Sequence, residues 1–117
     1  MVQLIKNHKV VITHGNGFQV GNILIRVEES LGKAYSIPLE VCVAESQGEL
    51  GYMIEQSLQN TLAKNKIKTP VVSILTQVLV DKKDPAFKDP TKPIGPFYTK
   101  SQAQKLMKKG FKLVEQI

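Results

Sequence analysis

Near the start of the chain stands Lys9-Val10-Val11-Ile12-Thr13-His14-Gly15-Asn16-Gly17, a β-branched run that ends in a glycine loop. A continuous apolar run of this kind is typical of a central parallel strand that is buried on both faces. Beyond the loop, apolar residues recur at helical spacing: Val20, Ile23, Leu24, Val27 and Leu31. The pattern therefore predicts a strand-loop-helix unit, whose helix turns Glu28 and Glu29 outward.

A longer helix is expected over residues 39–64, because Leu50, Ile54, Leu58 and Leu62 step by four along one face. Two readings of its first half are open. Ser46 and Glu49 could form a capping box that restarts the helix, or the glycines of this stretch could lie inside one bent helix.

A second apolar run over residues 71–80 follows Thr69-Pro70 and predicts another central strand. The order strand, helix, helix, strand favours parallel neighbours in one sheet. We expect an α/β fold, specifically part of a three-layer α/β/α sandwich.

The character of the chain changes at Asp81. Residues 81–96 contain four prolines and alternating charges, which predicts an excursion from the core, protruding over about residues 81–98. After it, Thr99 is expected to cap a helix over residues 100–109, with Gln102 completing a capping box and Gly110 closing the end.

The net charge of +6 is unevenly distributed, because residues 1–60 carry −2 and residues 61–117 carry +8. Fifteen of the sixteen cationic residues are lysines, aromatics are few, and no groove-entering motif is present. We therefore expect no nucleic-acid binding, and a lysine-rich face near a polyanionic substrate is the alternative.

Two features bear on the location of the protein. Cys42 lies in an apolar stretch, where a buried, reduced thiol is expected rather than a disulfide or a metal ligand. The run over residues 71–80 is too short and too polar to span a bilayer, so no membrane association is expected. Both features favour a cytoplasmic protein.

The loop of residues 14–17 is the candidate for chemistry. Open α/β sheets bind anions where a strand runs into a helix N-terminus, because free amide groups and the helix dipole converge there. Gly15 and Gly17 would allow close approach and a positive φ, and Asn16 would add donors. The alternative is a tight turn without a ligand. His14 is expected to support the loop by bonding to neighbouring backbone.

Several motifs together resemble the carbamate kinases of the amino acid kinase family. They are Thr13-His14-Gly15-Asn16-Gly17, Gln19-Val20-Gly21-Asn22, Ala44-Glu45-Ser46-Gln47-Gly48, Gly51-Tyr52, Leu75-Thr76-Gln77-Val78, Asp84-Pro85-Ala86-Phe87, and Pro90-Thr91-Lys92-Pro93-Ile94-Gly95-Pro96. The proline-rich excursion is the most specific of these. The resemblance implies reversible phosphoryl transfer between ATP and carbamate, with Mg²⁺, during arginine breakdown.

The resemblance also implies roles for individual residues. Gly15, Asn16 and Gly17 would hold the carbamate or the transferring phosphoryl group, and Lys92 would swing over the site as the catalytic residue. The alternative for Lys92 is a solvated loop lysine. Phe18 departs from the family pattern, which usually has proline there, and Glu40 stands where aspartate is common.

The resemblance covers well under half of a carbamate kinase. The first strand with its Gly-Gly-Asn loop and the lobe that binds ADP or ATP are expected to lie outside residues 1–117, so neither ATP nor Mg²⁺ has an evident site here. We expect the isolated chain to be inactive, and to self-associate or form a homodimer. The alternative is a non-enzymatic remnant or split-gene subunit that binds a small oxyanion such as carbamoyl phosphate.

Overall fold

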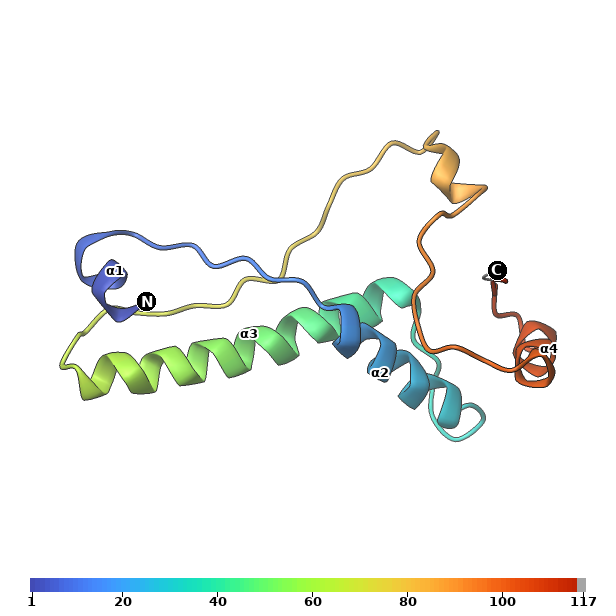
Figure 1. Cartoon of the computed structure of the whole chain (residues 1–117), viewed down its shortest axis with the longest axis horizontal. Helices are drawn as coiled ribbons and strands as arrows, with labels where there is room; N and C mark the ends of the chain where they lie inside the picture. Colours follow the sequence, from blue (N-terminus) through green and yellow to red (C-terminus); the bar gives the residue numbers. More distant parts are fainter. Residues whose placement is uncertain (116–117) are drawn as a thin grey trace.

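The computed structural model describes residues 1–115. The domain predicted over residues 1–117 therefore ends in two positions that lie outside the described residues. The elements, in chain order, are α1 (Val2–Asn7), α2 (Gly17–Glu29), α3 (Leu39–Lys64), the 3-10 helix η1 (Pro85–Phe87) and α4 (Lys100–Lys108), as Figure 1 shows. No helix in this part of the chain has the length and apolar character needed to cross a membrane.

Helix α2 packs against the N-terminal half of α3 and forms the small core of the molecule. Val20, Ile23 and Val27 recur on one face of α2, as predicted, and bury that face against Cys42 of α3. Burial raises the pKa of the Cys42 thiol, and the nearby Glu45 carboxylate raises it further. Cys42 is therefore a reduced, inert core residue.

Helix α3 is one continuous helix of 26 residues, which decides between the two readings of its first half. Ser46 does not restart the helix but lies wholly buried within it. Gly51 allows a close contact, because a Cβ at this position would lie 3.0 Å from Ser73 Oγ and 3.1 Å from Ser73 Cβ. The glycine thus permits the segment around Ser73 to lie directly on the helix.

The two predicted strands are extended but unpaired, and the predicted sandwich is not formed within residues 1–115. In this range the only β-type pairing is an isolated bridge between Leu31 and Ala34. Within the described residues the two segments have the extended backbone of strands without a strand ladder. Strand structure needs a neighbouring backbone at ladder distance, and apolar composition alone does not supply one.

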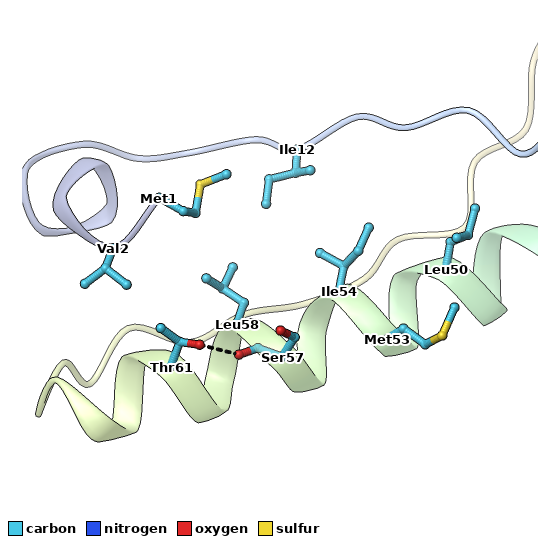
Figure 2. Close-up of a pocket in the computed structure, with 9 residues that line it drawn as sticks. All are labelled: Met1, Val2, Ile12, Leu50, Met53, Ile54, Ser57, Leu58 and Thr61. Atoms are coloured by element: carbon cyan, nitrogen blue, oxygen red, sulfur yellow. Dashed lines mark hydrogen bonds between the residues drawn. The ribbon is translucent and has the colours of Figure 1, made fainter.

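Both extended segments run along α3 in the same direction. In the first, Ile12 faces the middle of α3 beside Ile54 (Figure 2), and Asn16 reaches Ser46, nearer the start of the helix. In the second, the Val71 carbonyl accepts from Gln59 Nε2 at 3.5 Å, and the Thr76 amide donates to Gln47 Oε1 at 2.8 Å. Both segments therefore run opposite to α3 and parallel to each other, which is the arrangement of strands in a parallel sheet.

An apolar hollow of about 430 Å³ lies between α1, the first extended segment and α3. Figure 2 shows its lining: Met1, Val2, Ile12, Leu50, Met53, Ile54, Ser57, Leu58 and Thr61. The second extended segment leaves its apolar side chains in solvent, with Val78 81% exposed. The second extended segment is thus largely uncovered on the side away from α3.

The C-terminal third agrees with the predicted local structure. Residues 81–94 leave the helices and carry η1 at the far end of the excursion (Figure 1), with Asp84 capping η1 through its side chain. Thr99 and Gln102 form the predicted capping box of α4, and Gly110 follows that helix with a φ of 94°. Local sequence therefore determines these elements without help from a core.

Candidate functional site

The predicted glycine loop, residues 14–17, leads directly into α2. Asn16 is the N-cap residue, but its side chain makes no cap hydrogen bond to the helix. The first amides of α2, beginning with Gly17 and Phe18, therefore point out of the helix without a side-chain acceptor. Since the helix dipole is positive at this end, the site favours a small anion.

Gly15 and Gly17 keep the space in front of these amides open. A Cβ at either position would meet no heavy atom within 4 Å, so the chain's own packing does not require glycine there. The predicted positive φ was wrong, because the glycines with positive φ in residues 1–115 are Gly32, Gly95 and Gly110. At the loop, glycine provides access to the backbone and not an unusual backbone conformation.

Asn16 holds the loop against α3. Its Nδ2 donates to Ser46 Oγ at 2.8 Å, and Ser46 Oγ donates to the Val43 carbonyl at 2.6 Å. Ser46 is 0% exposed, so this relay is shielded from water. One N–H of Asn16 is used for positioning, and the second N–H is the one available for a ligand.

Ser46 is a site residue that the sequence did not reveal. Its motif, residues 44–48, contributed to the resemblance, but capping was the role considered for Ser46. A small hydroxyl residue within an apolar helix stretch is the signal that could have suggested a buried polar contact.

His14 and Lys92 differ in how closely the structure ties them to the loop. His14 Nδ1 lies 3.0 Å from the Gly15 carbonyl oxygen, a contact that is a hydrogen bond when the proton is on Nδ1. Lys92 is exposed and lies in irregular backbone, with no hydrogen bond to residues 14–17 among the described residues. The structure therefore brings His14, Gly15, Asn16 and Gly17 together and leaves Lys92 outside the group.

Lys92 lies close in sequence to a residue that contacts α2. Gly95 packs against Gly21 of α2, with 3.8 Å between the Gly95 Cα and a Cβ built at Gly21. Lys92 precedes Gly95 by three residues, at most about 10 Å of extended chain. Gly17 lies about 6 Å from Gly21 along the helix axis. The excursion is thus in contact with α2 only a short length of chain after Lys92.

No metal or nucleotide site is assigned among the described residues. Within residues 1–115 no group of three His, Cys, Asp or Glu side chains could hold a metal ion. The apolar hollow on α3 contains none of the predicted site residues and offers no charged group. No described residue is therefore assigned to Mg²⁺ or to a nucleoside triphosphate, and no step below is assigned to either.

Comparison with known proteins gives close relatives over nearly the whole chain. A carbamate kinase of Pyrococcus horikoshii is 52% identical over 113 residues, which are 94% of this chain and 36% of that protein. A carbamate kinase of Trichomonas vaginalis is 48% identical, over 98% of this chain and 38% of that protein. No protein-family model matches the chain.

Solved structures agree. The carbamate kinase from Giardia lamblia bound to AMP-PNP superposes with a TM-score of 0.78 at 44% identity, over 91% of this chain and 34% of that one. A crystal structure from Aeropyrum pernix superposes with a TM-score of 0.83 at 34% identity, again over 91% and 34%.

These structural neighbours support an amino acid kinase-like α/β fold for the chain. Within that class the chain is a homologue of carbamate kinases and corresponds to part of one. It spans about a third of the length of the relatives it matches.

Proposed function

We propose that residues 14–17 form the carbamate or phosphoryl-binding loop of a carbamate kinase, for which the reaction is ATP + carbamate = ADP + carbamoyl phosphate. The observation that carries this proposal is the uncapped N-terminus of α2, faced by two glycines that leave open space. Identity of about half over nearly the whole chain supports the same assignment. The arginine pathway and the cytoplasmic location remain predictions from the sequence.

The residues have separate roles in this proposal. The amides of Gly17 and the first turn of α2 bind a substrate oxyanion, and Asn16 donates its second N–H to the same group. The relay through Ser46 holds Asn16 in place, while His14 restrains the Gly15 carbonyl. Lys92 adds positive charge from the excursion, which suits phosphoryl transfer because that reaction depends on positioning and charge neutralisation.

The nucleotide would supply the phosphoryl group, and Mg²⁺ would neutralise its charge, as carbamate kinases require. No described residue is assigned to hold either of them. Carbamoyl phosphate and carbamate are therefore the ligands we assign to this part of the chain.

The isolated 117-residue chain should not make ATP from ADP and carbamoyl phosphate. No described residue is assigned to hold the nucleotide or Mg²⁺. The nucleotide and carbamoyl phosphate are therefore not positioned together for phosphoryl transfer. A coupled hexokinase assay on the purified chain measures this directly, with full-length carbamate kinase from P. horikoshii as the positive control. ATP formation above the blank that disappears in Lys92→Gln would show that the chain is active alone.

We further propose that the two extended segments are neighbouring strands of a three-layer α/β/α sandwich once additional strands pair with them. Their parallel course over α3, their unpaired backbone and the uncovered apolar hollow support this. Exposed apolar edges of this kind associate with other chains when nothing covers them. A homodimer or a larger self-association is the expected state.

Light scattering after size exclusion should therefore give a mass above the 13.0 kDa of one chain, rising with concentration. Val78→Lys should lower that mass, because a charge on an exposed edge opposes strand addition. Gln104→Lys is the control for added positive charge, since it adds the same single charge at an exposed position of α4, outside both extended segments. A constant monomer mass in the unchanged protein would contradict the proposal.

A further inference from the structure

The excursion returns to the helices along one stripe of α2. Gly21, Leu24 and Glu28 lie at i, i+3 and i+7, beside the stripe that is buried against α3. Gly95 meets Gly21 and Leu24, and Tyr98 meets Glu28. Residues 95–98 therefore run along α2 in the direction of the helix.

Two glycines, Gly21 and Gly95, lie in contact where the excursion meets α2. A Cβ built at Gly21 lies 3.8 Å from the Gly95 Cα, and a Cβ built at Gly95 lies 3.9 Å from Leu24 Cδ1. Gly95 also has a φ of +113°, a conformation that other residues rarely adopt. The chain is thus shaped to turn at the surface of α2.

A single hydrogen bond fastens the end of this segment. The Tyr98 hydroxyl donates to Glu28 Oε1 at 2.5 Å, and both side chains are half-buried. Among the described residues it is the one hydrogen bond that joins residues 81–115 to α2 or α3. Apolar burial contributes little here, because the intervening Phe97 is 89% exposed.

We propose that the Tyr98–Glu28 hydrogen bond and the Gly21–Gly95 contact form a latch that holds the base of the excursion on α2 and so keeps Lys92 within reach of the glycine loop. Tyr98, Glu28 and Gly21 are therefore positioning residues, because they touch no substrate. The catalytic part of this inference rests on the proposed role of Lys92. Its structural part, that these residues hold the base of the excursion on α2, stands independently.

The latch should be insensitive to pH through the neutral range. Burial and the Glu28 carboxylate raise the pKa of Tyr98 well above its usual range, so the phenol keeps its proton and donates. Because the folded-state pKa lies above the unfolded one, this contribution is complete below about pH 10 and is lost only as the phenol ionises above that.

Distance measurement between spin labels tests the latch. Labels placed through Phe18→Cys and Lys92→Cys report on the separation of the excursion from the start of α2, while Cys42 is buried and unreactive. Tyr98→Phe should raise the detached population about tenfold, because it removes a hydrogen bond to a charged acceptor. Tyr35→Phe is the matched control, since Tyr35 is 86% exposed.

Two further variants separate positioning from a general loss of structure. Gly21→Val should detach the segment, because a Cβ there already contacts the Gly95 Cα at 3.8 Å and the γ-methyl groups extend beyond it. Gly48→Val is the control, because a Cβ at that position meets nothing within 4 Å. Glu28→Ala should lower the attached population, and Glu28→Gln should keep most of it, because the amide oxygen of glutamine still accepts a hydrogen bond from the phenol. Helix content by circular dichroism should stay constant throughout.

An unchanged distance distribution in Tyr98→Phe or in Gly21→Val would overturn the latch. In protein that retains Lys92, Tyr98→Phe should also weaken binding of carbamoyl phosphate, and equal binding would overturn the link to Lys92. Failure of the unchanged protein to bind carbamoyl phosphate would instead count against the proposed function, with the distance data still deciding the latch.

Discussion

Replacing Asn16 by aspartate should weaken binding of carbamoyl phosphate by about 10-fold to 100-fold, the loss expected when a hydrogen bond to a charged ligand disappears. The carboxylate cannot donate to the ligand, and it places a negative charge next to the free amides of α2. Helix α2 should persist, because aspartate is a favourable N-cap residue. Isothermal titration with carbamoyl phosphate, and with inorganic phosphate as a second ligand, measures the effect.

Asn22→Asp is the matched control for this change. Asn22 lies on the exposed side of α2, so the same substitution adds the same charge away from the loop. Equal weakening by the two variants would point to a general charge effect and not to a site at residues 14–17. Unchanged affinity in Asn16→Asp would remove the glycine loop from the proposed function.

Replacing Ile23 by alanine should abolish cooperative unfolding of the chain. Ile23 is 3% exposed at the centre of the α2–α3 contact, and truncation of such a side chain costs about 2–5 kcal/mol of unfolding free energy. Among the described residues only five apolar side chains are buried: Val20, Ile23, Val27, Cys42 and Leu62. A core this small leaves little stability to lose.

Thermal and urea unfolding followed by circular dichroism measure this loss. Ile25→Ala is the control on the same helix, because Ile25 is 38% exposed and lies off the buried face. A sigmoidal transition in Ile23→Ala like that of the control would mean that the α2–α3 core does not provide most of the folding stability.

The helices could be predicted from the sequence because their determinants are local. The spacing of Val20, Ile23 and Val27 defined α2, and Thr99 with Gln102 defined the start of α4. The continuity of α3 past Ser46 could not be predicted, because a serine can either cap a helix or lie buried within one. Ser46 lies buried, and its hydroxyl accepts a hydrogen bond from Asn16, which is distant in sequence.

The strands could be recognised only as extended, apolar segments. Their β-branched residues favour extended backbone, and both segments are extended in the structure. Pairing is a property of two backbones, and within residues 1–115 neither segment has a neighbouring strand. Composition therefore predicts the extended conformation, whereas the pairing of the segments in a sheet stays a prediction.

For the candidate site, sequence alone located the loop at residues 14–17 and its place between an extended segment and a helix, since these follow from short-range pattern. Sequence placed Glu28 on the outer side of its helix, whereas the structure shows it bonded to Tyr98, 70 residues away along the chain. The sequence also indicated no partner for Asn16, whose side chain donates a hydrogen bond to Ser46, 30 residues away. Such contacts depend on how separate elements pack together, so only the tertiary structure could decide them.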